Sequence, residues 1–368
     1  MLLLEVLLWA CLGALVWTHL AYPLAAALVA RLRERPVRRA EAEPTVSVVV
    51  AAHDEETVIA RRLENLLALD YPVEKLELVV ASDASTDCTD ELVRSFAGRG
   101  VRLVVCPRGG KVAAQDRAVR ETSGEVVAFS DANATWAPDA LRTLVRSFAD
   151  PQVAYVCGRL VLQDAAGSNR EGAYWRYELW LRASESRLHS VTGGNGSIYA
   201  LRRADYVEVD PRFGHDLAFP YLMVQRGRRA VYEPEALAFE RPTPTNETEY
   251  RRKVRMFEHC WLITLRGSLL RRLPPIYWVE VVSHRLLRYG SGLLHLGLLG
   301  SSLALAVLDG AWLWWAALGA QGALLAAAAA GVGIARYYVL VTWATVVSLA
   351  NYLRRGVPAT WEAAEGTR

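Results

Sequence analysis

The chain has 368 residues, 22% of them charged, and a formal net charge of +3 at pH 7. This length accommodates a soluble domain and a second structural unit, and the near-neutral charge argues against a nucleic-acid-binding protein. The cysteines are odd in number, widely scattered and never spaced as Cys-x-x-Cys, which predicts a reducing compartment and no structural zinc site. They are Cys11, Cys88, Cys106, Cys157 and Cys260.

Residues 1–30 are predicted to form an N-terminal transmembrane helix. Only Glu5 and His19 in this segment are ionisable near neutral pH, and a spanning helix needs about 20 mostly apolar residues. A buried core helix is the alternative. No Lys or Arg precedes the segment, whereas five arginines follow it in a basic linker, residues 31–44. This charge order is that of a membrane anchor rather than a signal peptide, and it predicts that the next domain faces the cytoplasm.

Four short apolar strands follow the linker and alternate with amphipathic helices. Their β-branched, nearly continuous sequences are typical of parallel strands covered on both faces. Polar residues come directly after each strand, and in open α/β sheets ligands bind at these strand ends. The predicted strands are Val46–Ala51, Leu76–Ala81, Val101–Cys106 and Glu125–Ser130. The groups after them are His53-Asp54-Glu55-Glu56, Asp83-Ala84-Ser85-Thr86-Asp87, Gly109-Gly110-Lys111 and Asp131-Ala132-Asn133.

In order and spacing, these four groups resemble the nucleotide-sugar-binding half of the family 2 inverting glycosyltransferases, which have the GT-A fold. The resemblance continues through Gly193-Gly194-Asn195-Gly196, His215-Asp216 and Arg252-Lys253-Val254-Arg255. It implies an α/β GT-A domain at residues 45–261, inserted between the N-terminal transmembrane helix and a C-terminal transmembrane helix bundle.

The resemblance implies a donor site on the first two strand ends. Ala51, Ala52 and Glu55 resemble nucleotide contacts of the first strand, where Asp54 stands in place of the usual Asn and adds a charge near an anionic ligand. Asp83 resembles the aspartate that binds the base.

Lys111 is a candidate phosphate ligand on its own chemistry. It opens a helix after two glycines, and a helix N-terminus combined with an ammonium group suits a phosphate. A Walker loop is excluded because Val112, not Ser or Thr, follows the lysine.

Asp131 is the expected ligand of a divalent cation, Mg²⁺ or Mn²⁺, which would bridge a carboxylate and the phosphates. By resemblance it is the first acid of an Asp-x-Asp motif, whose second position is the neutral Asn133. A helix cap or turn former is the alternative for an aspartate in this position.

The second half of the domain is expected to bind the acceptor. Gly194, Asn195 and Gly196 resemble the family's glycine-rich acceptor turn, before a predicted strand at Ser197–Leu201, although an ordinary loop has the same composition. Asp216 matches the catalytic base of the family, where the preceding acid is replaced by His215.

Arg252 and Arg255 resemble the Gln/Arg-x-x-Arg-Trp motif of processive synthases, with Met256 in place of the tryptophan. Arginines three apart share one helix face and could contact the donor diphosphate. The missing tryptophan weakens the case for a processive polymerase, and a basic face beside anionic lipid is the alternative.

The C-terminal part is predicted to return to the membrane. Residues 262–290 include an amphipathic interfacial helix at Pro275–Tyr289. Residues 291–355 contain three apolar stretches that resemble spans, and residues 356–368 form a tail. Three spans would place Arg354 and Arg355 outside, so either one stretch is re-entrant or the positive-inside tendency is broken. The stretches are Gly292–Leu308, Trp312–Val332 and Tyr337–Leu353.

Together these features predict a family 2 glycosyltransferase of the cytoplasmic membrane. It would move a hexosyl or N-acetylhexosaminyl group from a nucleotide sugar, a UDP-sugar in the first instance, to a lipid-linked or polysaccharide acceptor. The expected partners are this donor, a glycan or glycolipid acceptor, membrane lipids and other envelope polysaccharide proteins. The alternatives are a processive polysaccharide synthase and a non-catalytic, membrane-tethered nucleotide-binding subunit.

Overall fold

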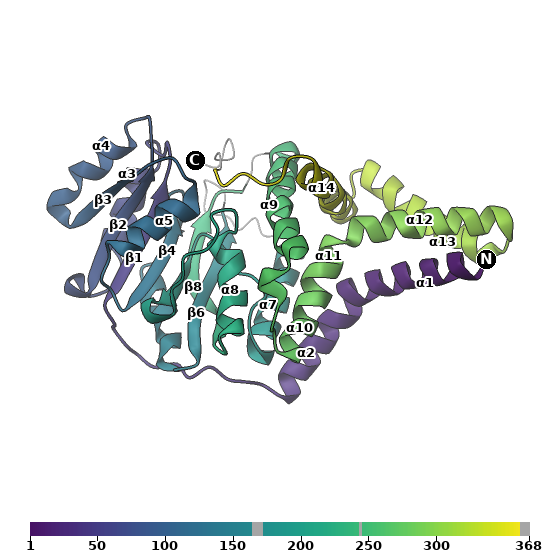
Figure 1. The fold of residues 1–368 in the computed structure, drawn as a ribbon, viewed down its shortest axis with the longest axis horizontal. Coiled ribbons are helices and arrows are strands. Elements are labelled where there is room, and N and C mark those ends of the chain that lie inside the picture. Colours follow the sequence, from purple (N-terminus) through teal and green to yellow (C-terminus); the bar gives the residue numbers. More distant parts are fainter. Residues whose placement is uncertain (164–171, 243–244, 361–368) are drawn as a thin grey trace.

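A computed structural model describes residues 1–163, 172–242 and 245–360 of the chain. It contains a mixed α/β domain, a layer of helices against one side of that domain, and a narrow arm of helices that projects away from it (Figure 1).

The α/β domain is built on one eight-stranded sheet with the order β3-β2-β1-β4-β7-β6-β8-β5. The four predicted strands are confirmed as its parallel part, with small differences at their ends. Residue pairs Ala51–Asp131 and Asp83–Cys106 lie in register, so the predicted polar groups share one edge of the sheet. These strands are β1 Val46–Ala52, β2 Leu76–Asp83, β3 Val101–Cys106 and β4 Val126–Asp131.

The second half of the sheet is formed by later segments. The strand β7 runs antiparallel to both β4 and β6 and joins the two halves. It begins at Tyr199 rather than Ser197, because the Asn195 side chain accepts a hydrogen bond from Ile198 N and keeps the preceding residues in a turn. These strands are β5 Thr135–Trp136, β6 Val153–Leu162, β7 Tyr199–Arg202 and β8 Arg229–Glu240.

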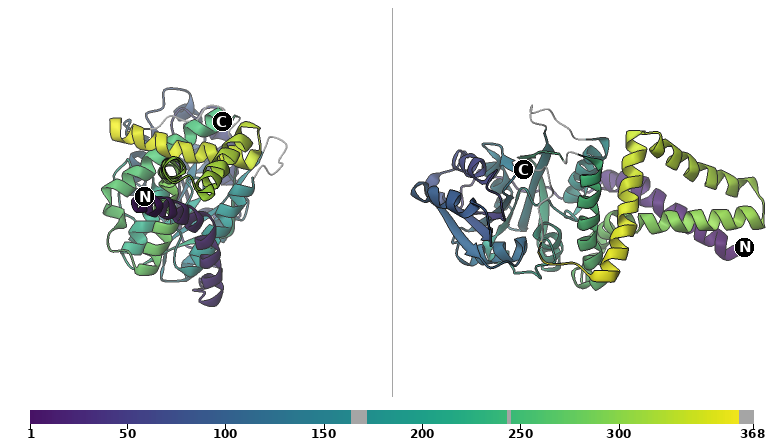
Figure 2. Two further views of the ribbon diagram at one scale, coloured as in Figure 1. Left: turned by 90° about the vertical axis from the view of Figure 1, so that its right-hand side faces the viewer. Right: turned by 90° about the horizontal axis from the view of Figure 1, so that it is seen from above.

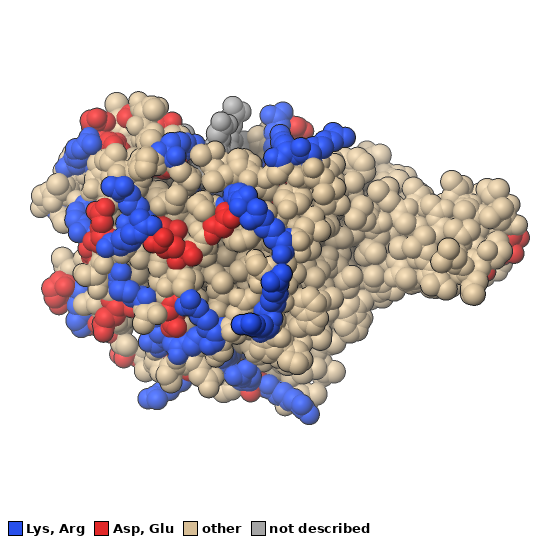
Figure 3. Space-filling model, viewed as in Figure 1, with Lys and Arg blue, Asp and Glu red and all other residues tan. Residues whose placement is uncertain are grey.

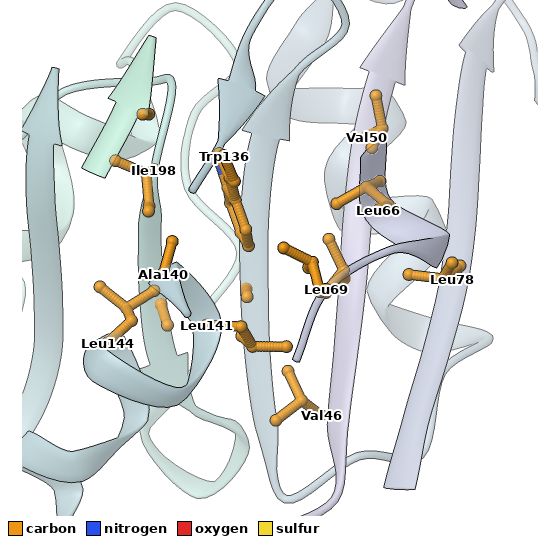
Figure 4. Close-up of a cluster of buried hydrophobic side chains, with 14 of the residues drawn as sticks. Val46, Val50, Leu66, Leu69, Leu78, Trp136, Ala140, Leu141, Leu144 and Ile198 are labelled. Carbon is orange, nitrogen blue, oxygen red and sulfur yellow. The ribbon is translucent and has the colours of Figure 1, made fainter. Parts of the chain in front are cut away.

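Helices cover both faces of the sheet and bury two hydrophobic cores. Figure 4 shows the Trp136 ring inside the first core, beside Leu69 and Leu141. The helices of the domain are α3 Ile59–Leu67, α4 Thr89–Ser95, α5 Lys111–Arg120, α6 Ala140–Val145, α7 Ala173–Leu188, α8 His215–Gln225 and α9 Asn246–Arg266. The predicted domain boundary at residue 261 therefore falls inside α9, which continues to Arg266.

The N-terminal segment is one bent helix that is long and apolar enough to cross a membrane. It consists of α1 Leu2–Val16, the π-helical turn η1 Trp17–Ala21 and α2 Tyr22–Leu32, so it extends two residues beyond the predicted end at Ala30. Leu2 and Leu3 are 75% and 80% exposed. Side chains this apolar and this exposed are typical of a membrane-facing surface, which argues against the alternative of a core helix.

The segment predicted as an interfacial helix is helical and consists of α10 Pro275–Glu280, the π-helical turn η7 Val281–Leu286 and α11 Leu287–Tyr289. Its polar residues Glu280, His284 and Arg288 are buried against the protein, whereas Trp278 and Val279 are 40% and 51% exposed. A helix exposed to water has the opposite arrangement, with its apolar side chains buried and its polar side chains exposed. It fits a helix whose outer face lies in the membrane interface.

Two C-terminal helices, α12 Ser291–Leu308 and α13 Trp312–Ala329, project with α1 and form the arm seen in Figures 1 and 2. In the space-filling view, charged side chains crowd the α/β domain but are almost absent from the arm (Figure 3). The arm is therefore the part with the chemistry of a bilayer-spanning region.

The third C-terminal helix, α14 Gly333–Arg355, is also long and apolar enough to cross a membrane. It runs instead across the direction of α12 and α13, along the boundary with the α/β domain (Figure 2). Trp261 Nε1 donates to Thr345 O at 2.9 Å, and Asn351 Nδ2 donates to Glu258 at 2.8 Å, which fixes α14 to α9. The C-terminal end of α14 therefore lies against the α/β domain, where Arg355 pairs with Glu258 at 3.1 Å.

Candidate active site

Lys111 and Asp131 meet at the carboxyl edge of the sheet. Lys111 is the first residue of α5, Asp131 is the last residue of β4, and their side chains form an ion pair. A Cβ atom on Gly196 would lie 2.8 Å from Lys111 Nζ and 3.1 Å from Asp131 Oδ2. The predicted acceptor turn therefore reaches the predicted phosphate and cation ligands, and a side chain at position 196 would push against both of them.

Asp216 contributes to the electrostatics of the same edge. Burial alone would lower the pKa of Lys111, but the charges of Asp131 and Asp216 raise the pKa above its usual value. Lys111 is therefore an ammonium group at neutral pH, and in this structure its charge is paired with Asp131.

Asp216 lies in the first turn of α8, two residues after Gly214, the N-cap residue of this helix. Gly194 N donates a hydrogen bond of 2.8 Å to the Asp216 carbonyl, which joins the glycine-rich turn to the start of α8. A Cβ atom on Gly214 would lie 2.9 Å from Asp216 Oδ1. The structure thus brings the predicted base and the predicted acceptor turn together from positions 20 residues apart.

His215 takes the place of the acid that precedes the base in the family's motif, and it is buried. Its Nε2 lies 3.2 Å from Asp116 Oδ1, and its Nδ1 lies 3.3 Å from the Tyr199 hydroxyl. Burial lowers the pKa of His215, although the neighbouring Asp116 opposes this effect. His215 therefore anchors the start of α8 through hydrogen bonds and does not contribute a second carboxylate.

Asp83 shapes the loop that leads into α5. Its carboxylate accepts hydrogen bonds from Gly109 N at 2.7 Å and Gly110 N at 3.1 Å, and it pairs with Arg108 at 2.7 Å. It is 2% exposed. The predicted contact of Asp83 with a nucleotide base stays a prediction, while its observed contacts set the course of the chain just before Lys111.

The backbone conformation after β1 explains why an aspartate is tolerated at position 54, where the family usually has Asn. Asp54 has a φ of +53°, in the left-handed region that Asn and Asp tolerate better than most residues. Its Oδ1 accepts a 2.7 Å hydrogen bond from Thr86 N, which ties the first strand end to the second. Ala51, Ala52 and Glu55 are all buried beside this connection.

The remaining predicted residues have different surroundings. The Asn195 side chain donates to Gly158 O at 2.7 Å and is 8% exposed, so its amide holds the turn from within the protein. Arg252 pairs with Glu249 at 2.9 Å on α9. Arg252 also lies within electrostatic range of Glu240, which places it near the rim of the site. Arg255 is one helical turn further along the same helix.

Glu240, at the end of β8, is a candidate site residue that the sequence analysis missed. Its carboxylate accepts a hydrogen bond from the hydroxyl of Ser197, the neighbour of Gly196. Burial and the nearby Asp131 raise the pKa of Glu240 to about 7. Asp131 was identified as a candidate because it is an acid at the end of a strand. The same pattern would have identified Glu240 at the end of β8.

The oxygen atoms at this edge fit a hard divalent cation. Asp131 supplies a carboxylate, Asn133 an amide carbonyl two residues later, and Glu240 lies within electrostatic range of Asp131. Among the described residues, no three His, Cys, Asp or Glu side chains converge as a complete metal site. A cation here would therefore take its other ligands from phosphate oxygens and water, as Mg²⁺ commonly does.

The C-terminal tail returns to this region after α14. Val357 is buried in a core with Phe213 and Val224, and the carbonyl of Ala359 packs directly against Gly110. A side chain on Gly110 would overlap this carbonyl, and the φ of +89° there also favours glycine. The described part of the tail, up to residue 360, therefore borders the loop that precedes Lys111.

Comparisons with known proteins agree with this geometry. Residues 47–209 match the model of the family described as "Glycosyl transferase family 2". A beta-monoglucosyldiacylglycerol synthase of Synechocystis sp. is 32% identical over 42% of this chain and 33% of its own length. An N-acetylglucosaminyltransferase of Rhizobium meliloti is 28% identical over 75% of this chain and 68% of its own length. The chain thus spans about a third of the length of the first relative.

A solved structure is similar along almost the whole chain. The mannosyltransferase PcManGT from Pyrobaculum calidifontis, determined in complex with GDP-Man and Mn²⁺, superposes with a TM-score of 0.74 and 25% sequence identity. The match covers 95% of this chain and 98% of that chain, so it includes the apolar arm as well as the α/β domain. Residues 47–209 therefore match glycosyltransferase family 2, and the chain has a GT-A-like fold between an N-terminal helix and C-terminal helices that are apolar enough to span a membrane.

Proposed function

We propose that the chain transfers a hexosyl or N-acetylhexosaminyl group from a nucleotide-diphosphate sugar to a lipid-linked or polysaccharide acceptor, with inversion at the anomeric carbon. The meeting of Lys111, Asp131, Gly196 and Asp216 at one edge of the sheet is the observation that supports this function most strongly. It combines a cation for phosphate, a carboxylate for a metal, a backbone without a side chain at Gly196 and a second carboxylate for a proton.

On the donor side, the diphosphate binds at the N-terminus of α5, where Lys111 and the helix dipole both favour an anion. Asp131 and Asn133 hold a divalent cation, Mg²⁺ or Mn²⁺. When bound, this cation acts as a Lewis acid that stabilises the negative charge of the leaving diphosphate. Arg252 and Arg255 approach the same charge from α9.

On the acceptor side, Asp216 accepts the proton of the attacking hydroxyl. The hydroxyl oxygen forms a bond to the anomeric carbon on the face opposite the diphosphate, and the carbon–oxygen bond to the diphosphate breaks. Asp216 is suited to this task because His215 anchors its helix and Gly194 holds its backbone, so its carboxylate starts from a defined position.

The similar proteins support the chemical classes in this proposal. The mannosyltransferase structure contains a nucleotide sugar and Mn²⁺, and two of the similar sequences carry names of a glucosyl-diacylglycerol synthase and an N-acetylglucosaminyltransferase. A UDP-sugar is our first choice of donor, and GDP-mannose is the natural comparison.

A screen of purified protein in nanodiscs tests this function. Isothermal titration with UDP- and GDP-sugars, each with Mn²⁺ and with a chelator, should identify at least one donor whose binding requires the cation. The same donor should then be hydrolysed or transferred. Binding without any turnover would favour the non-catalytic subunit, and long polymeric products would favour a processive synthase. Absence of binding to every nucleotide sugar would contradict the proposal.

We also propose that the α/β domain faces the cytoplasm, where nucleotide sugars are made. Cys88 is exposed on this domain, whereas Asp309 lies in the turn between α12 and α13 at the far end of the arm. In intact cells, an impermeant maleimide should label a cysteine placed at Asp309 and should label neither Cys88 nor a cysteine placed at Arg354. Labelling of Cys88 before lysis would show that the orientation is reversed, and labelling at Arg354 alone would show that α14 crosses the membrane.

A further inference from the structure

A buried arginine lies beneath the carboxyl edge of the sheet. Arg62, on α3, is 1% exposed and forms no ion pair among the described residues. Its Nη2 donates to Ser130 Oγ at 2.7 Å, its Nη1 donates to Asn65 Oδ1, and its Nε has no hydrogen-bond partner. A buried charge without an opposite charge in contact is destabilising, because its lost hydration is not offset. A role for this charge in the neighbouring site would explain why it is buried there.

The surroundings of Arg62 preserve its positive charge. Burial lowers the pKa of the guanidinium group to about 9, while the charges of Asp131 and Glu240 oppose this shift. The central carbon of the guanidinium group lies 4.9 Å from the centre of the Trp136 ring, within the range of a cation–π contact. Arg62 is therefore a cation at neutral pH, and the two carboxylates within its electrostatic range are those of the candidate metal site.

Hydrogen bonds connect Arg62 to the chain segments that carry the site. Ser130, which accepts from Arg62, precedes Asp131 at the end of β4, and its hydroxyl lies 3.1 Å from Ser197 O. The hydroxyl of Ser197 in turn donates to Glu240. The guanidinium group is therefore built into the protein wall that carries Asp131 and Glu240, and its burial prevents it from touching a bound ligand.

Cations and acids lie close together in this site before any ligand binds. Lys111 is paired with Asp131, and burial together with the nearby Asp131 raises the pKa of Glu240 to about 7. A divalent cation that enters alone adds positive charge beside Lys111 and Arg62, and both oppose it. A cation that enters with the donor diphosphate brings negative charge with it, which offsets this repulsion. The charge of Arg62 thus distinguishes a bare cation from a cation bound to diphosphate.

We propose that Arg62 is a positioning residue that makes the site bind its divalent cation together with the donor diphosphate rather than alone. This inference rests on the proposed function, in which Asp131 holds the cation. Arg62 acts through the charge that Asp131 and Glu240 experience, and its hydrogen bond to Ser130 fixes where that charge lies. The site then binds free Mn²⁺ weakly, and it binds the complex of Mn²⁺ and donor without this repulsion.

Mn²⁺ binding in the absence of nucleotide tests the effect of this charge. Arg62→Met replaces the guanidinium group with an unbranched apolar side chain beside Trp136. By electron paramagnetic resonance on protein in nanodiscs, its affinity for free Mn²⁺ should rise by about threefold to tenfold, as expected for one charge at the moderate effective dielectric of a protein. Its affinity for the nucleotide sugar in a chelator should fall by a similar factor, and its affinity for the complex of both should change little. A general loss of structure would lower all three affinities.

Three further variants separate the charge of Arg62 from its packing. Arg62→Lys keeps the charge and should bind free Mn²⁺ as weakly as the wild type does. Arg62→Gln keeps polar atoms without the charge and should behave like Arg62→Met, so it also answers the question if Arg62→Met does not fold. Arg229→Met is the matched control, because Arg229 is 3% exposed, lies at the other end of β8 from Glu240 and donates to Ser186 O at 3.0 Å. It should lower the thermal midpoint and leave the three affinities unchanged.

The affinity for free Mn²⁺ decides the inference separately from the proposed function. Unchanged or weaker binding of free Mn²⁺ in both Arg62→Met and Arg62→Gln, with donor binding intact in the wild type, would overturn this inference alone. An Arg62→Lys protein that behaves like Arg62→Met would also overturn it, because the shape of the guanidinium group would then matter rather than its charge. A wild type that binds no nucleotide sugar in any condition would instead contradict the proposed function.

Discussion

Asp216→Asn is expected to bind the nucleotide-sugar donor normally and to transfer sugar about 100-fold to 10,000-fold more slowly, the usual effect of removing a general base. Asn keeps the size of the side chain but cannot accept the proton of the acceptor hydroxyl. The contacts that hold this turn involve the backbone of Asp216 and the ring of His215, so the substitution leaves them in place. Nucleotide affinity, thermal midpoint and transfer rate should be measured on one preparation.

Asp87→Ala is a suitable control for a purely structural aspartate. Asp87 accepts a 3.0 Å hydrogen bond from Thr89 N at the start of α4, and losing such a cap typically costs about 1 kcal/mol of stability. This variant should have a lower thermal midpoint and nearly normal turnover. Nearly normal turnover in folded Asp216→Asn would rule out its role as base. A parallel loss of donor binding and transfer would instead assign Asp216 to the donor site.

The placement of the proposed donor residues at one edge of the sheet could be predicted from sequence because its signals are local. Each strand is an uninterrupted apolar run, its polar group follows directly, and parallel pairing places Ala51 and Asp131 at the same edge. Lys111 needs only its two glycines and the helix behind it to be recognised. For these residues, the apolar run predicts the strand, and the end of the run predicts which edge of the sheet the next side chain occupies.

The parts that depend on contacts distant in sequence were not predicted. Glu240 comes close to Asp131 through the pairing of β5 with β8, which sets Thr135, four residues after Asp131, opposite Phe239, the neighbour of Glu240. The direction of α14 could not be read from hydropathy, since α14 has the length and composition of a span. Its packing on α9, through contacts such as Trp261 to Thr345, decides that it lies along the domain boundary.

Asp131→Ala is expected to abolish the metal-dependent component of nucleotide binding, whereas Asn133→Asp should retain or strengthen it. Two adjacent phosphates cannot be neutralised by Lys111 alone, and a carboxylate is a better ligand for a hard cation than an amide. Titration with the donor, in Mn²⁺ and again in a chelator, gives the metal-dependent part as the difference between the two affinities. Mn²⁺ binding followed by electron paramagnetic resonance checks the same site without turnover.

The ion pair between Lys111 and Asp131 affects how the nucleotide affinity of Asp131→Ala is interpreted. Removing Asp131 frees Lys111 from its partner, so affinity for the nucleotide in chelator can rise even as the response to Mn²⁺ disappears. Total affinity alone would therefore hide the effect. Asp131→Asn, which keeps the shape of the side chain, should behave like Asp131→Ala if charge is the essential property. A loss of Mn²⁺ response in Asn133→Asp would show that the neutral amide is required, because a second charge beside Asp131 and Glu240 then repels the diphosphate more than it attracts the cation.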